Sequence, residues 1–135
     1  MKVLILSFCI VVMTVCNATA QSYDTDVARC DKVYEDQSAN DNSTLSIIRT
    51  LSDHTDCYEK IVFKIIDTEY SKNSDNMKQN FTDYINLAGE MVGFVGRPDS
   101  CYPNCGTIVS INGAMARRDA ALRYLNSILK RDEPI

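Results

Sequence analysis

Apolar residues recur at intervals of three and four along much of this chain, which is the spacing that gathers side chains on one face of an α-helix. The clearest stripe predicts a core helix in "DCYEKIVFKIIDTEY", with Thr55 as its N-cap. The residues on this stripe are Tyr58, Ile61, Val62, Ile65, Ile66 and Glu69 or Tyr70. We therefore expect this helix to pack in the protein interior.

Two further stripes predict long helices over about 75–95 and 107–131, the second bent near Gly113. The first stripe comprises Met77, Phe81, Tyr84, Ile85, Ala88, Met91, Val92 and Val95. The second comprises Ile108, Ile111, Met115, Leu122, Leu125 and Leu129. Gly89 and Gly93 lie beside the first stripe and weaken a helix, so we expect another helix backbone to approach closely there.

Two shorter helices precede these three. One is expected over about 24–36, and the other in "LSIIRTL", capped by Ser43 or Thr44. The chain is thus predicted to form a small all-α, disulfide-linked bundle of about five helices, in which the three long helices bury their stripes against each other.

The N-terminus has the pattern of a secretory signal peptide. Lys2 precedes an apolar run from Val3 to Val15, and the small residues Ala18, Thr19 and Ala20 follow. The run is too short to span a bilayer, which takes roughly twenty apolar residues. We expect residues 1–20 to be removed and residues 21–135 to form a single helical domain, exported to the periplasm or secreted.

Charge narrows the range of partners. After loss of the leader, 13 basic residues stand against 18 acidic ones, a net charge of −5. Nucleic acid is an improbable partner for such a chain because phosphates require clustered Lys and Arg. The charge favours a basic protein instead, and the remaining chain has no apolar stretch long enough for stable membrane insertion.

Four cysteines remain in the expected mature chain: Cys30, Cys57, Cys101 and Cys105. An even number in a small exported protein indicates two disulfides. Cys30 with Cys57 and Cys101 with Cys105 is the favoured pairing, although spacing leaves the two crossed pairings open.

The segment "PDSCYPNCGT" is interpreted as a structural clip. Three residues separate its cysteines, whereas reactive dithiols usually have two, and neither further cysteine pairs nor histidines are available to complete a metal site. Tyr102, between two prolines, is a candidate contact residue or a cover for the end of the bundle.

No catalytic group stands out in the sequence. His54 in "LSDHTD" could join Ser52 and an acid, but no nucleophile elbow accompanies it, so we interpret it as a polar loop residue. The carboxylates Asp53, Asp56 and Glu59 lack an apolar setting suited to acid catalysis. We predict a protein that is not an enzyme and uses no cofactor or metal; a cleft holding His54 beside a serine and an acid would argue otherwise.

Asn42 and Asn80 each begin an N-glycosylation pattern, "NST" and "NFT". Modification at either would require a eukaryotic secretory pathway.

The segment "DCYEKIVFKIIDTEYSKNSDNMKQNF" resembles the LprI-type lysozyme inhibitors, a group of small periplasmic proteins. Cys57 at the helix start, Asp67 ten residues on and Tyr70 carry the resemblance, which covers about a quarter of the chain. It departs from that pattern in having "PDSCYPNCGT" where an aromatic-Arg-Asp-Cys segment is expected. The resemblance implies a small helical periplasmic protein that inhibits lysozyme.

Two functions from different classes follow. The first is an exported protein that occludes another protein, such as an inhibitor or immunity protein against a cell-wall-degrading enzyme, with acidic charge attracting a basic hydrolase. The alternative is a carrier that holds a small apolar ligand within the bundle. A void between the helices would favour the carrier, and a filled interior with an exposed acidic or aromatic patch would favour the occluding protein.

Overall fold

The computed structural model describes residues 23–95 and 105–129, all of them in helices or the short turns that join them. Residues 23–38 are helical, and α2 (Thr44–Glu69), the 3-10 turn η1 (Ser71–Asn73), α3 (Ser74–Val95) and α4 (Cys105–Ile128) follow. The described ranges thus contain four α-helices, which confirms the predicted all-α class. Residues 1–20, Cys101 and Tyr102 lie outside the described residues, so the leader and the Cys101–Cys105 pairing remain predictions.

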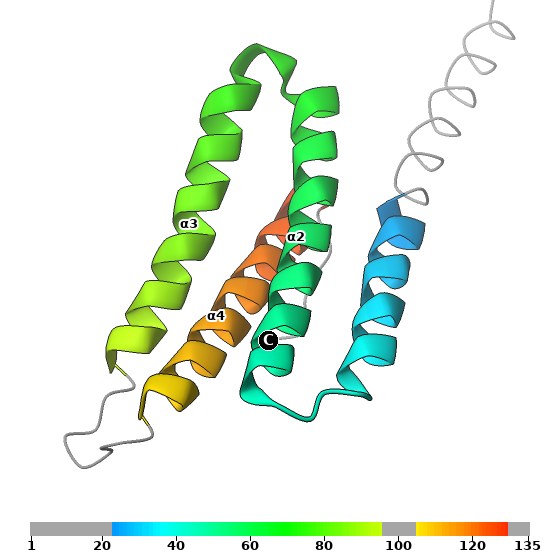
Figure 1. The fold of residues 1–135 in the computed structure, drawn as a ribbon. Helices are drawn as coiled ribbons and strands as arrows, with labels where there is room; N and C mark the ends of the chain where they lie inside the picture. The colour runs from blue at the N-terminus through cyan, green and yellow to red at the C-terminus, as the bar shows by residue number, and fades with distance from the viewer. Residues whose placement is uncertain (1–22, 96–104, 130–135) are drawn as a thin grey trace, which may run out of the picture.

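The helices surround α4. This helix packs against both α2 and α3, whereas α2 and α3 make few contacts with each other after the turn that joins them. The helix over 23–38 lies on the other side of α2 from α3 (Figure 1). The arrangement therefore leaves α3 at one side of the molecule and the 23–38 helix at the other.

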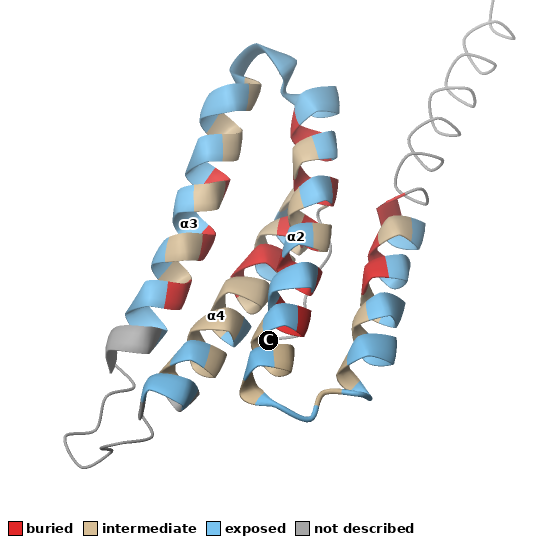
Figure 2. Cartoon of the chain, viewed as in Figure 1, coloured by how far each residue is buried: buried red, intermediate tan, exposed pale blue. Residues whose placement is uncertain are grey.

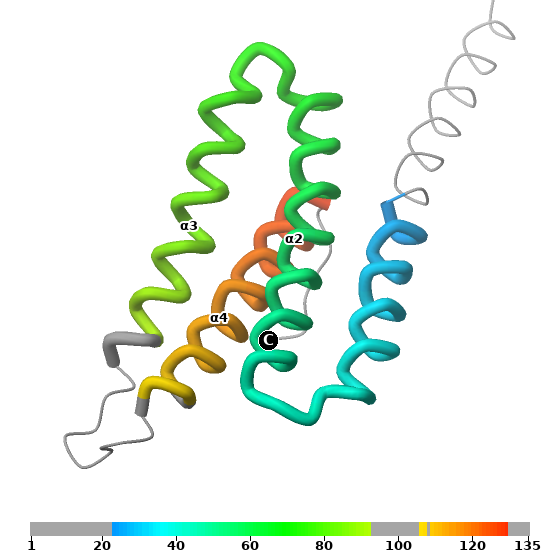
Figure 3. Tube along the Cα trace, viewed as in Figure 1, coloured from blue at the N-terminus to red at the C-terminus, as the bar shows by residue number. Residues whose placement is uncertain are grey.

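The expected break between a second and a third helix is absent, because α2 is one continuous helix from Thr44 to Glu69 (Figure 3). Thr55 does not cap a helix; its hydroxyl donates to the carbonyl of Leu51, 2.8 Å away, within the helix. The N-cap is Ser43, whose hydroxyl accepts from the Ser46 amide while the Ser46 hydroxyl accepts from the Ser43 amide, each at 3.1 Å. This capping box satisfies helix-end donors and fixes where α2 begins.

The core consists of side chains from all four helices (Figure 2). Its largest fully buried members are Phe81, Ile66, Ile85, Leu125, Val62 and Cys30. The stripe predicted for α2 is buried from Tyr58 to Ile66, but Glu69 and Tyr70 are exposed at the helix end. On α3 the prediction held only in part, since Phe81 and Ile85 are buried whereas other members of the stripe face outward.

The predicted close approach at Gly89 is confirmed. A Cβ at Gly89 would lie 3.1 Å from the carbonyl oxygen of Gly113 on α4, and a Cβ at Gly113 would lie 3.2 Å from that of Gly89. The two helices cross at glycines because a larger residue at either position would force the backbones apart.

Candidate functional site

A disulfide joins the 23–38 helix to α2 through Cys30 and Cys57, whose Cα atoms are 5.8 Å apart. This is the pairing that the sequence favoured for these two cysteines. The link is supported by Asp26, which accepts from Lys64 on α2 at 3.2 Å and from Arg29 at 3.0 Å. The first helix is thus held to α2 by a covalent bond and by an ion pair.

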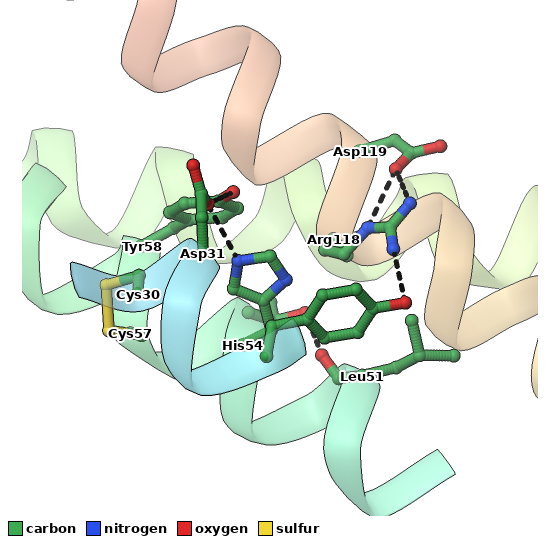
Figure 4. Close-up of polar contacts among 10 residues, drawn as sticks. Cys30, Asp31, Leu51, His54, Cys57, Tyr58, Arg118 and Asp119 are labelled. Atoms are coloured by element: carbon green, nitrogen blue, oxygen red, sulfur yellow. Dashed lines mark hydrogen bonds and ion pairs between the residues drawn. A yellow bond between two sulfur atoms is a disulfide. The ribbon is translucent and has the colours of Figure 1, made fainter. Parts of the chain in front are cut away.

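His54 occupies a position in the helix and is buried, not in a polar loop as predicted from its acidic neighbours. Its ring lies between those of Tyr34 and Tyr58, with centroids 4.4 Å from each. Nε2 is 3.1 Å from Oδ1 of Asp31, which also accepts from the Tyr58 hydroxyl at 2.5 Å (Figure 4). Because a carboxylate can only accept, Nε2 carries the proton.

Nδ1 of His54 is buried and has no hydrogen-bond partner among the described residues. Burial lowers the pKa of His54, the hydrogen bond and charge of Asp31 raise it, and the charge of Arg118 lowers it; the net shift is downward. The neutral ring therefore serves as a packing element between two tyrosines. Ser52 is exposed, so the His54, serine and acid cleft that would argue for an enzyme is not formed by these residues.

Arg118 attaches α4 to the same cluster. Its guanidinium donates to the Tyr34 hydroxyl at 3.1 Å and to Asp119 at 2.7 and 3.0 Å, and it lies 5.4 Å from the centre of the Tyr34 ring. The cluster thus joins the first helix, α2 and α4, and its geometry indicates a structural role.

An open groove of about 550 Å³ lies where the first helix turns into α2. Three carboxylates, Asp36, Asp41 and Asp53, line it with a single arginine, Arg49. The other lining residues are Gln37, Asn40, Ser43, Leu45, Ser46 and Thr50. We call this the acidic groove.

Local structure fixes the shape of the acidic groove. The Thr50 hydroxyl donates to Oδ1 of Asp41 at 3.1 Å, which holds the connecting turn against α2, and the capping box holds the start of the helix. Leu45 lies at the groove with 70% of its surface exposed. The site therefore offers negative charge beside an apolar contact, and it is open to a protruding partner.

The distribution of charge reinforces this site. Residues 23–60 contain nine acidic and four basic residues, whereas the rest of the described chain contains six of each. All of the net negative charge of the described chain thus belongs to the first helix and the N-terminal part of α2.

Sequence reasoning noted Asp53 only as one of several scattered carboxylates and did not single out Asp36 or Asp41. The turn that brings the three together was visible as a polar break, but their proximity depends on how the two helices pack. The residues that carry the resemblance lie elsewhere: Asp67 is exposed and accepts from Lys78, and Tyr70 is the exposed C-cap of α2.

In residues 23–95 and 105–129, no group of three metal-ligating side chains is close enough to hold an ion. No helix in these ranges combines the length and apolar character needed to cross a membrane. Comparisons with protein-family models, curated proteins and solved structures give no match.

Proposed function

We propose that this chain is an exported, non-enzymatic protein that binds a basic protein and occludes it, in the manner of an inhibitor or immunity protein against a cell-wall-degrading enzyme such as lysozyme. The observation that carries the proposal is the acidic groove, placed in the part of the chain that holds the net negative charge.

The groove suits a basic partner for two reasons. Three carboxylates against one arginine attract Lys and Arg side chains and accelerate encounter. Exposed Leu45 supplies an apolar contact within the charged surround, a combination typical of protein interfaces. An open groove also fits a protruding loop better than it fits a small molecule, which usually needs a more enclosed pocket.

Export is supported by the leader pattern of residues 1–20 and by the Cys30–Cys57 disulfide, because such bonds persist mainly in oxidising compartments. The resemblance to the LprI-type inhibitors supports lysozyme as the kind of target. The carrier is the weaker proposal, since the buried stripes pack against each other and the three grooves described here are open at the surface.

The test is association of the purified oxidised protein with a panel of purified basic cell-wall hydrolases, lysozyme included. Neutralising the groove with Asp36→Asn and Asp53→Asn should slow association roughly tenfold at low salt, because steering depends on these charges. A matched control, Glu69→Gln with Asp75→Asn, makes the same change in net charge at exposed positions outside the groove.

Binding accompanied by loss of hydrolase activity, weakened by the groove pair and not by the control pair, would support the proposal. Absence of binding to every hydrolase at low salt would overturn it, as would equal effects of the two variants, which would reduce the role of the groove to that of net charge.

A further inference from the structure

A second surface is formed by α3 and α4 on the side away from α2. Apolar residues are exposed along it: Tyr84 (45%), Leu87 (56%), Met91 (58%), Val92 (39%) and Met115 (41%). Those on α3 follow helical spacing and form a single stripe. A shallow groove of about 370 Å³ runs beside the stripe, with Ala116 and Ala120 of α4 at its floor.

This surface is distinct from the one that α2 covers. The other groove between α3 and α4 is lined by Gly89, Gly113 and Ile48 of α2, so it faces the interior side of the helix pair. The stripe from Tyr84 to Val92 faces the opposite side. Contiguous exposed apolar residues of this kind mark interaction sites.

We propose that the α3–α4 face binds a second copy of this chain and makes a symmetric dimer. The first argument is charge. The part of the described chain beyond residue 60 has equal numbers of acidic and basic residues, whereas residues 23–60 are strongly acidic. Two copies would repel each other through their acidic ends, so self-association is favoured where the charges balance.

The second argument is the position of the charges on this face. Exposed Asp83 lies on α3 and exposed Arg123 on α4, next to Tyr84 and Tyr124, whose rings are 6.2 Å apart. The two charged residues are thus at the same level of an antiparallel helix pair (Figure 1).

A two-fold axis parallel to the helices would lay α3 of one copy over α4 of the other at the same level. Arg123 would then face Asp83 of the second copy, twice in the dimer. The stripe of Tyr84 and Met91 would sit over the small residues Ala116 and Ala120, which leave room for large side chains. The surface is therefore self-complementary in both shape and charge.

The experiment is a charge exchange monitored by analytical ultracentrifugation of the oxidised protein over a range of concentrations. The unaltered protein should dimerise. Asp83→Arg alone places arginine against arginine, and Arg123→Asp alone places acid against acid, so each should raise the dimer Kd by at least about tenfold. An equimolar mixture of the two variants should form a heterodimer, in which both pairs are opposite in sign.

Leu87→Asp should also abolish the dimer, while Val33→Asp, at a similarly exposed apolar residue on the first helix (48%), should leave it intact. Circular dichroism of each variant establishes that it is folded. A monomer at every concentration would overturn the proposal, whether a foreign partner or another segment of the chain covers the face. A dimer insensitive to Leu87→Asp, or a mixture that fails to associate, would overturn the assigned surface. Hydrolase binding by monomeric Leu87→Asp would leave the proposed function standing, so the two proposals fail separately.

Discussion

At the scale of single residues, His54 has the most unusual environment. Its ring is enclosed by Tyr34 and Tyr58, one nitrogen donates to Asp31, and the other is buried without a partner in the described chain. Protonation would place a charge beside Asp31, which favours it, but also in a desolvated position near Arg118, which does not. Burial prevails, so the folded protein holds the neutral form more strongly than the unfolded chain does.

This environment predicts how stability depends on pH. The pKa of His54 is lowered from 6.5 on folding, so below about pH 6.5 the unfolded chain binds more protons and the free energy of unfolding should fall as pH falls. Urea unfolding from about pH 7 to pH 5 measures the slope, and His54→Phe, which keeps a ring in the stack, should reduce it.

The difference between the two proteins isolates His54 from other groups. The pKa of Glu59 is raised by burial and by Asp56 and lowered by Arg117, with a net rise, which gives a contribution of opposite sign that both proteins share. Parallel slopes for His54→Phe and the unaltered chain would show that His54 does not titrate differently on folding.

The sequence contained a usable signal for His54 that composition obscured. His54 lies three residues after Leu51 and four before Tyr58, on the buried stripe of α2. Its acidic neighbours Asp53 and Asp56 suggested a solvated loop, yet they lie on the exposed face of the same helix. The partner that makes burial affordable, Asp31, comes from another helix, so only the tertiary structure reveals it.

At the scale of elements, the crossing of α3 and α4 depends on two glycines. A methyl group at Gly89 would lie 2.6 Å from Cγ of Arg117 as well as 3.1 Å from the Gly113 carbonyl oxygen. The arginine stem can move, but the backbone oxygen belongs to the facing helix and cannot move without separating the pair.

Gly89→Ala should therefore destabilise the protein by about 1–3 kcal/mol, despite the gain in helix propensity that alanine brings. Gly106→Ala on α4 is the control, because nothing lies within 4 Å of its added Cβ, and it should be neutral or stabilising by up to ~1 kcal/mol. Urea unfolding of both variants checks this, and a stabilising Gly89→Ala would contradict the close crossing.

The disulfide gives a second prediction for elements. The first helix buries a short stripe of Tyr23, Val27 and Cys30, and depends on Cys57 for its covalent link to α2. In Cys30→Ala/Cys57→Ala we expect a loss of about 2–4 kcal/mol. Hydrogen exchange should show residues 23–38 losing protection before α3 and α4, whereas uniform loss along the chain would contradict this order.

Helix positions were more predictable than helix boundaries. Apolar spacing located the four helical regions and the buried stripe of α2, because periodicity follows directly from which face is covered. The polar run from Ser52 to Asp56 was wrongly predicted to break α2, since Thr55 can bond within a helix as well as cap one. On α3 the sequence could not reveal that Tyr84 and Met91 would remain uncovered, because that depends on where α2 and α4 end up.

At the scale of the whole molecule, charge is divided between two parts. The acidic residues of the first helix and early α2 surround a groove, and the remainder of the described chain is balanced. The imbalance can be counted along the sequence, but the groove required the packing of two helices. Like charges gathered for binding also repel each other when no partner is bound.

This repulsion predicts a stability cost at the acidic groove. Asp36→Asn with Asp53→Asn should stabilise the unbound protein by up to about 1 kcal/mol at low ionic strength, and added salt should narrow the difference. Urea midpoints at two salt concentrations measure the effect, with Glu69→Gln/Asp75→Asn as the matched control. Lower stability of the groove variant would indicate that these carboxylates support the fold.

The Cys30–Cys57 bond has a consequence for when the protein can act. The acidic groove lies between the end of the first helix and the start of α2, and this bond holds those two elements together. A newly made chain still in a reducing compartment would lack the assembled groove, so premature capture of a basic protein inside the producing cell would be avoided. Oxidation would then serve as the licence to bind, granted only after export.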